Sequence, residues 1–258
     1  MAVDEAILEA SGRGLVPPTL RLFAWAPPCL SLGYAQPFTD VDLAVLEQRG
    51  WEVVRRPTGG RAILHTDELT YSVSGSVDEP RLVGGVLESY RVLADALLYA
   101  LQLLDIPAQA EEKPGSATSP AGKPDQNPVC FEVPSNYEIT VGGKKLIGSA
   151  QARRKEGVLQ HGSLPLYGDL TRIVRALVFP DGQARERAAS HLLERATTAE
   201  RILGRPMEWD QAAQAFAEAF TKVLNLQLLP GDLIPQERQR AEALVAEKYA
   251  NSAWTARA

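Results

Sequence analysis

Cysteine and histidine are scarce in this sequence. Its 258 residues include only two cysteines, Cys29 and Cys130, and three histidines. Two thiols cannot build a disulfide framework in a chain of this length, and no secretory leader is recognisable at its start. The cysteines and histidines are also too scattered for the ligand spacing of a zinc site. We therefore predict neither a disulfide scaffold nor a metal site, and we expect a cytoplasmic protein.

Long apolar runs and an excess of positive charge are missing as well. No apolar segment approaches the roughly 18 residues of a membrane-spanning helix. The net charge of -5 argues against nucleic acid as the main partner, because phosphate backbones reward clustered Lys and Arg. Hydrophobic residues at 45% and charged residues at 23% are ordinary for a folded soluble protein. We expect one large domain, or a main domain with a small appendage, that binds neither membrane nor nucleic acid.

The first two thirds of the chain alternate strand and helix patterns. Alternating apolar positions and turn residues predict strands over 20–25, 29–34, 51–56, 62–65, 69–74, 137–141, 145–147 and 158–166. Helical periodicity predicts helices over 2–10, 40–48 and 86–104.

Helical patterns fill the last third of the chain. Expected helices cover 170–179, 185–195, 199–203, 209–224 and 236–249. Strands followed by a run of helices predict an α+β fold, with mixed or antiparallel sheets flanked by helices. We place the main domain at residues 1–183 and a helical C-terminal appendage, packed on it, at residues 184–258.

Cys130 follows a segment over 107–128 that is rich in Pro, Gly, Ser, Lys and Glu and is predicted to be a long mobile loop. A single cysteine is most often an inert buried thiol. The position of Cys130 directly after this loop favours exposure instead. Cys29 lies inside a strand pattern and keeps the inert interpretation.

Lys145 follows a predicted hairpin turn at Gly142-Gly143. A hairpin lysine is usually solvated, but apolar residues and then small residues come next in Leu146-Ile147-Gly148-Ser149-Ala150. Because side chains alternate along a strand, Lys145 would face inward and Lys144 outward. Only a thiolate is a strong nucleophile, and a nearby cation lowers the pKa of a thiol. Cys130 and Lys145 are therefore a possible acyl-transfer dyad, whereas in a ligase the lysine would contact a carboxylate or acyl-phosphate oxygen.

A second candidate segment is Arg55-Arg56-Pro57-Thr58-Gly59-Gly60-Arg61. Paired glycines let backbone N–H groups approach a ligand, and Arg56 could supply a fixed positive charge. The segment could hold a phosphate, a carboxylate or a thioester carbonyl, or it could be an ordinary hairpin turn with surface arginines. Its spacing fits neither a P-loop nor a dinucleotide fingerprint.

The three histidines give weaker evidence for a functional site than these two segments do. His161, in Leu159-Gln160-His161-Gly162-Ser163, could line the same pocket or be a structural histidine bonded to backbone. His65 has the same alternatives with a stronger structural leaning. His191 lies in a polar helix pattern and is expected at the surface.

These segments together resemble the biotin/lipoate protein ligase superfamily, and most closely its LipM-type octanoyltransferase branch. The resemblance rests on their order along the chain. It is carried by the arginine–glycine segment with His65, by Asp67-Glu68-Leu69-Thr70-Tyr71-Ser72-Val73, by Cys130-Phe131-Glu132-Val133-Pro134-Ser135, by residues 145–151 and by residues 159–163. Each piece alone is weak, but the combination is specific and spans almost the whole chain.

The resemblance implies the catalytic-domain fold of that superfamily and transfer of octanoyl. The family's nucleophile falls on Cys130, its activating lysine on Lys145 and its arginine–glycine loop on Arg56, Gly59 and Gly60. Further candidate substrate-binding residues are His65, Gly148, Ser149, Ala150, His161 and Gly162. The implied donor is octanoyl-acyl carrier protein, and the implied acceptor is a lysine of a lipoyl domain, from the glycine-cleavage H protein or a 2-oxoacid dehydrogenase E2. No cofactor is expected, because a thioester already stores the activation, and a monomer is the default.

Three departures from the family pattern bear on this interpretation. Relatives carry a strand before the first helix, and Thr66 separates His65 from Asp67. Arg61 stands where ligase relatives have a third glycine, which favours the transferase. The alternatives are an ATP- and Mg²⁺-dependent lipoate–protein ligase that uses Lys145 on an adenylate, and a non-catalytic module that binds a lipoyl domain.

Overall fold

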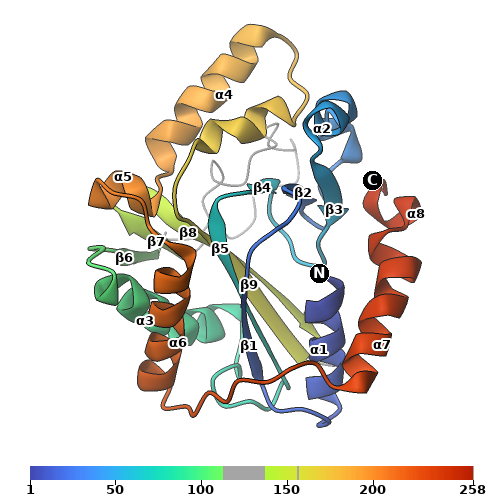
Figure 1. Ribbon diagram of the computed structural model, residues 1–258, viewed down its shortest axis with the longest axis vertical. Coiled ribbons are helices and arrows are strands. Elements are labelled where there is room, and N and C mark those ends of the chain that lie inside the picture. The colour runs from blue at the N-terminus through green and yellow to red at the C-terminus, as the bar shows by residue number, and fades with distance from the viewer. Residues whose placement is uncertain (113–136, 156, 258) are drawn as a thin grey trace.

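Two sheets form the frame of the protein. The computed structural model describes residues 1–112, 137–155 and 157–257. Within these ranges the strands are β1 (Thr19–Phe23), β2 (Cys29–Leu32), β3 (Glu52–Arg55), β4 (Ile63–His65), β5 (Glu68–Gly75), β6 (Gln109–Glu112), β7 (Tyr137–Val141), β8 (Lys144–Arg154) and β9 (Gly157–Pro165) (Figure 1).

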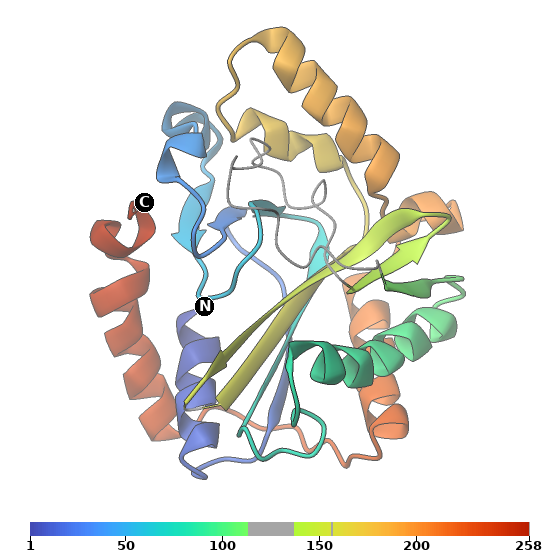
Figure 2. The ribbon, with the colours of Figure 1, turned by 180° about the vertical axis from the view of Figure 1, so that it is seen from behind.

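The larger sheet has six strands in the order β1-β5-β9-β8-β7-β6, and every neighbouring pair is antiparallel. The smaller sheet has the order β3-β2-β4, with β2 parallel to β3 and antiparallel to β4. β8 and β9 are the longest strands, and Figure 2 shows them running from the β6–β7 side of the molecule to α1 (Ala2–Gly12).

Helices flank both sheets. Besides α1, the described helices are α2 (Leu43–Arg49), α3 (Val86–Leu103), α4 (Gly182–Arg195), α5 (Ala199–Leu203), α6 (Trp209–Val223), α7 (Pro235–Leu244) and α8 (Ser252–Thr255). Two 3-10 turns, η1 (Phe38–Asp40) and η3 (Leu170–Arg175), and a π-helical turn, η4 (Val245–Tyr249), complete them. None of these helices is long and apolar enough to cross a membrane.

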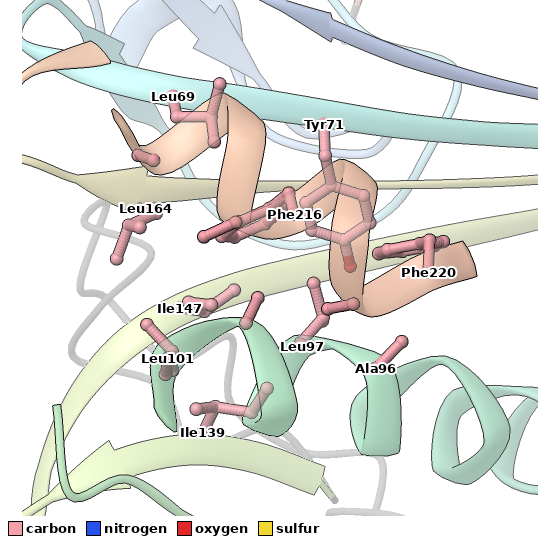
Figure 3. Packing of buried hydrophobic residues seen from close by; sticks show 14 of the residues in the cluster. Leu69, Tyr71, Ala96, Leu97, Leu101, Ile139, Ile147, Leu164, Phe216 and Phe220 are labelled. Atoms are coloured by element: carbon pink, nitrogen blue, oxygen red, sulfur yellow. The ribbon is translucent and has the colours of Figure 1, made fainter. Parts of the chain in front are cut away.

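The main core lies between the large sheet and the helix pair α3 and α6. Figure 3 shows Tyr71 of β5 pointing toward Phe216 and Phe220 of α6, with Leu97 of α3 close to them. All four side chains are essentially inaccessible to solvent, and each large apolar side chain buried in this way contributes about 1.5–3 kcal/mol to folding. Helix α6 from the C-terminal third therefore packs directly on the sheet, while the division at residue 183 stays a prediction.

The opposite face of the sheet carries α1, and α7 packs on α1 (Figure 1). From there the chain runs through η4 to α8, which lies against β3 of the small sheet. The indole Nε1 of Trp254 donates to the backbone oxygen of Arg55 over 2.9 Å. The end of the described chain is thus fastened to the strand that leads into the arginine–glycine segment.

The predicted α+β class, with mixed and antiparallel sheets flanked by helices, is confirmed. Two element predictions were wrong. The helix expected over 170–179 is the shorter 3-10 turn η3, and the loop expected from 107 contains β6. β6 is short and polar, and it forms because β7 offers a free edge with which it pairs. Residues 113–128 of the predicted loop lie outside the described ranges.

Candidate functional site

A single cavity gathers the predicted site residues. It has a volume of about 1510 Å³ and is lined by parts of β2, β4, β8, β9, the arginine–glycine segment and the start of α3. All ten predicted site residues that the structure describes line it: Arg56, Gly59, Gly60, His65, Lys145, Gly148, Ser149, Ala150, His161 and Gly162. The eleventh, Cys130, lies outside the described residues, so its place relative to the cavity stays a prediction.

Lys145 is buried in the wall of this cavity. Its Nζ donates to Oε1 of Glu138 over 3.0 Å, and both side chains are 5% exposed. Withdrawing two charges from water is costly, and such a pair persists only when its partners satisfy one another. The sequence predicted an inward, partly desolvated lysine, and the structure adds the carboxylate that holds it.

Local geometry decides which of two adjacent lysines faces the cavity. Gly142 and Gly143 have φ of 56° and 75°, the left-handed values that a two-residue hairpin turn of this type requires. The turn sets the register of β8, and alternation then sends Lys144 and Lys145 to opposite faces. The Lys144 side chain is exposed, and its Nζ donates to the backbone oxygen of Leu193 over 2.7 Å.

Arg56 shapes the arginine–glycine segment from inside. Its guanidinium donates to the backbone oxygens of Gly59, Arg61 and Ser31 at 2.9, 2.7 and 2.9 Å, and the residue is 2% exposed. These bonds fold residues 56–61 around a buried cation. The sequence had offered Arg56 as a charge for a ligand, and the structure shows guanidinium N–H groups bonded to the segment's own backbone.

A chain of short hydrogen bonds lies behind the segment. Ser31 Oγ and His65 Nε2 are 2.7 Å apart, and His65 Nδ1 lies 2.6 Å from Oε1 of Glu68. The indole of Trp25 stacks on the His65 ring at 4.2 Å between centroids, with an interplanar angle of 11°. His65 is therefore held on three sides by side chains, and it also lines the cavity.

His161 is a neutral residue of the cavity wall. Its Nε2 lies 2.7 Å from the Thr58 hydroxyl. Burial lowers the pKa of His161 to about 3, because desolvation disfavours the charged ring and the nearby Arg56 cation opposes it further. Its neutral ring thus fixes Thr58 of the arginine–glycine segment to β9, so it lines the pocket and is structurally bonded at the same time.

Two polar side chains of β8 that line the cavity, Ser149 and Gln151, are held by hydrogen bonds to residues behind its wall. Tyr71 Oη lies 2.7 Å from Ser149 Oγ and accepts from Gln160 Nε2 over 3.0 Å. Burial raises the pKa of Tyr71 to about 12, so its hydroxyl keeps its proton near neutral pH. Gln151 Nε2 continues the chain to Gln160 Oε1 over 2.9 Å. The segment after Lys145 therefore presents fixed hydrogen-bonding groups to whatever enters the cavity.

Cys29 has none of the properties of a nucleophile. It lies in β2, is buried, and burial raises the pKa of its thiol to about 12. The described residues contain no group of three or more His, Cys, Asp or Glu side chains that could hold a metal ion.

Several polar neighbours of the predicted site residues were missed from the sequence. They are Glu138 beside Lys145, and Ser31, Glu68 and Ser163 around His65. One signal was available for Glu138. Alternation in Tyr137–Val141 puts Glu138 and Thr140 on one face, and Thr140 pairs with Lys145 across the hairpin.

The fold and the site define a family. Residues 1–221 match the family model of the lipoyl protein ligase A/B catalytic domain. The chain belongs to this family.

Two relatives within this family are similar to the chain over nearly their whole length. The chain is 43% identical to octanoyltransferase LipM of Symbiobacterium thermophilum, over 100% of this chain and 93% of the relative. It is also 43% identical to octanoyltransferase LipM of Kyrpidia tusciae, with the same coverage of both chains.

Solved structures agree on the fold. A bi-partite lipoate protein ligase from Thermoplasma acidophilum, described with its E2 lipoyl domain, superposes with a TM-score of 0.77 at 25% identity, over 99% of this chain and 89% of that one. Lipoate-protein ligase A bound with ATP gives a TM-score of 0.78 at 25% identity, over 99% and 92% of the two chains.

Proposed function

We propose that this chain is an octanoyltransferase of lipoate biosynthesis, which moves octanoyl from octanoyl-acyl carrier protein to a lysine of a lipoyl domain. One observation carries the proposal: the residues predicted from the family pattern line one cavity, with the Lys145 cation buried in its wall. Relatives named octanoyltransferase LipM, which align over the whole chain, support the same activity.

The mechanism uses the thiol of Cys130 as an acyl carrier. The Cys130 thiolate attacks the octanoyl thioester, and the carrier protein leaves as its own thiolate. The lysine amine of the lipoyl domain then attacks the acyl-cysteine and takes the octanoyl group as an amide. In this mechanism Lys145 steadies the thiolate and the tetrahedral oxyanion. Removing one such donor typically costs about 10²- to 10³-fold in rate.

The acceptor class follows from the chemistry of the family. The lipoate protein ligase of Thermoplasma acidophilum was described with an E2 lipoyl domain, which supports a lipoyl domain as the partner here. We propose the glycine-cleavage H protein type as the acceptor, and a 2-oxoacid dehydrogenase E2 domain as the substitute to compare with it.

An ATP-dependent lipoate ligase is the second candidate function, and it is less well supported. The ligase structures are 25% identical to this chain, whereas the relatives named octanoyltransferase reach 43%. Arg61 also occupies the third position of the glycine segment, where the ligase pattern has glycine. A ligase would consume ATP and would have no use for Cys130.

Intact-mass spectrometry tests the proposal directly. The protein is mixed with octanoyl carrier protein without ATP, and we expect a mass increase of one octanoyl group. The adduct should be absent from Cys130→Ala and present in Cys29→Ala, because the buried Cys29 thiol stays protonated. The two variants remove the same atom from the same residue type, so they separate a nucleophile from a general loss of thiol.

Each other function gives a different result. A Cys130→Ala enzyme that keeps full activity and consumes ATP would establish the ligase. A complex with the lipoyl domain that forms without any acyl adduct on the protein would establish a binding module.

A further inference from the structure

Arg153 on β8 places a positive charge in the wall of the cavity. Its Nη2 donates to the backbone oxygen of Leu82 over 2.6 Å, and its Nη1 donates to Ser89 Oγ and Gln151 Oε1 over 3.1 and 3.2 Å. The three acceptors come from the segment before α3, from α3 and from β8, so the guanidinium is fixed by three parts of the chain. Arg153 itself is half-buried and lines the cavity.

The charge of Arg153 has no counterion among the residues that the structure describes, since all three acceptors are neutral. The adjacent Arg154 differs, because its Nη1 lies 2.7 Å from Oε1 of Glu5. Glu88, which precedes Ser89 on α3, is exposed and is not among the residues that line the cavity. Two neighbouring arginines on one strand therefore differ in kind, since one is neutralised by an ion pair and the other is held by neutral dipoles.

The guanidinium of Arg153 also keeps donors for a ligand. An arginine has five N–H groups and no acceptor, and the bonds to Leu82, Ser89 and Gln151 use two of them on Nη1 and one on Nη2. The Nε–H and one N–H of Nη2 make no bond to the described part of the chain. Guanidinium N–H groups bind phosphate or carboxylate oxygens with charge-assisted bonds that are about twice as strong as neutral ones. The ligand class that suits this side chain is therefore an anion.

The start of α3 adds an apolar surface to the cavity. Val86, Leu87 and Tyr90 line the cavity, and they lie within one helical turn of Ser89, which holds Arg153. Val86 is 51% exposed, so apolar area is open to a ligand there. A fixed cation near exposed apolar side chains suits an anionic group that belongs to a larger organic molecule.

The separation of Arg153 and Lys145 fits the dimensions of a thioester donor. The two residues lie eight positions apart on β8, which corresponds to about 26 Å along a strand (Figure 2). In an acyl carrier protein the thioester ends a phosphopantetheine arm, and this arm is about as long as six extended residues, or about 20 Å from phosphorus to sulfur. The lengths of the lysine and arginine side chains cover the difference.

We propose that Arg153 binds the phosphate of the donor's phosphopantetheine arm while the thioester lies near Lys145. This inference rests on the proposed octanoyl transfer and names the group by which the donor is recognised. The acceptor lysine carries no phosphate. Arg153 therefore acts in the acylation of Cys130, and it has no part in the later transfer to the lipoyl domain.

A comparison of two donors tests the assignment. Octanoyl-phosphopantetheine carries the phosphate and octanoyl-pantetheine lacks it, and intact mass follows the rate at which each acylates the protein at low donor concentration. Arg153→Gln should slow acylation by the phosphate-bearing donor by about 10- to 100-fold, the size expected when hydrogen bonds to a charged group are lost. Acylation by octanoyl-pantetheine should be unchanged. Arg153→Lys should recover part of the rate, because it keeps the charge and loses the planar fork.

Arg154→Gln is the matched control, because the charge of Arg154 is already paired with Glu5. It should leave acylation by both donors unchanged. Equal slowing with both donors in Arg153→Gln would mean a structural role and would overturn the assignment, as would normal rates with both. An equal loss in Arg154→Gln would mean a general attraction of anions and would also overturn it. If Arg153→Gln fails to fold, Arg153→Lys carries the test, since it should still slow only the phosphate-bearing donor.

A binding measurement separates this site from the proposed function. In the Cys130→Ala protein, which lacks the proposed nucleophile, titration calorimetry measures the affinity for phosphopantetheine without an acyl group. Adding Arg153→Gln should weaken that affinity by the same factor as it slows acylation. Displacement of phosphopantetheine by an equal concentration of ATP would assign Arg153 to a nucleotide phosphate and overturn the proposal. A parent protein that binds phosphopantetheine through Arg153 and never forms the octanoyl adduct would instead overturn the proposed function and leave the anion site standing.

Discussion

Lys145 and Glu138 form a buried ion pair, with Nζ and Oε1 3.0 Å apart, in the cavity wall that holds the predicted site. The pair joins neighbouring strands of the hairpin, β8 and β7. It therefore makes two contributions, since it places a cation at the site and it gives a nearly buried carboxylate a charged partner.

The first prediction concerns the stability of this pair. Lys145→Met leaves the Glu138 carboxylate without this lysine partner, and breaking one side of a buried pair typically costs about 3–5 kcal/mol. The double variant Lys145→Met with Glu138→Gln should recover a large part of that loss, because it removes both charges of the pair. Urea unfolding gives the free energies for a double-mutant cycle.

Lys144→Met is the matched control for that cycle. Its ammonium is exposed, so the free energy of unfolding should change by no more than about 0.5 kcal/mol. Losses of equal size at Lys144 and Lys145 would contradict the assignment of the ion pair.

The second prediction concerns close packing at Gly162. A Cβ built on this residue would lie 2.6 Å from Ser149 Oγ and 2.7 Å from the Gly148 backbone oxygen. Because the Gly148 oxygen belongs to the backbone of a paired strand, it cannot move aside without disturbing the pairing of β8 with β9. We expect Gly162→Ala to lower the free energy of unfolding by about 1–3 kcal/mol, as overpacking of a core does.

Gly182, at the start of α4, is the comparison for Gly162. No atom lies within 4 Å of a Cβ built there, so Gly182→Ala should leave stability nearly unchanged. Thermal unfolding followed by circular dichroism measures both variants. Equal melting temperatures for the two alanine variants would contradict the close approach of β8 and β9.

The hairpin shows what sequence reasoning could predict here. A glycine pair fixes the turn, and alternation along β8 then decides that Lys145 faces inward and Lys144 outward. Both rules are local, so they work on a single sequence. The same local rules found α5 with the bounds it has in the structure.

These local rules could not predict contacts between segments that are distant in the sequence. Ser31 and His65 are separated by 34 positions, and nothing in either segment indicates that they meet. The strand β6 was missed for a similar reason, since its pairing with β7 decides its conformation and its own polar sequence does not. The position of Cys130 relative to Lys145 stays a prediction.

The third prediction is a loss of stability in mild acid that depends on His161. Its ordinary pKa is 6.5, and burial lowers the pKa in the folded protein to about 3. Between these values the unfolded chain binds a proton that the folded chain does not. The stability is therefore complete above about pH 6.5 and falls as pH drops toward 3, by up to about 1.4 kcal/mol per pH unit.

Urea unfolding at several pH values between 6.5 and 5 measures this slope. The carboxyl groups of Asp4, Glu5 and Glu68 have lowered pKa values in the fold, so their contributions are lost only below the ordinary range of 3.8–4.5. His161→Gln should flatten the slope in this window, and His191→Gln should keep it. An unchanged slope in His161→Gln would show that another group titrates.

The fourth prediction concerns Arg55, which ties the C-terminal segment to the cavity wall. Its guanidinium is fully buried and donates to the backbone oxygens of Thr255 and Arg257 at 3.0 and 2.8 Å. It also donates to the oxygens of Gly33 and Gln36 at 2.8 and 2.6 Å, in the turn after β2. The first side chain of the arginine–glycine segment thus connects α8 to the turn after β2.

Replacing this arginine should loosen both ends of the connection. Arg55→Met leaves several carbonyl oxygens without their donor, and hydrogen bonds to a charged group contribute about 1.5–3 kcal/mol each. We expect the free energy of unfolding to fall by at least about 3 kcal/mol, and the backbone amides of 252–257 to exchange hydrogen faster than those of α6. Hydrogen exchange with mass spectrometry resolves the two segments. Arg205→Met, on the exposed turn before α6, should change neither the free energy of unfolding nor the hydrogen exchange of 252–257. If 252–257 stayed protected in Arg55→Met, Trp254 and its aromatic neighbours would be holding the segment without the guanidinium.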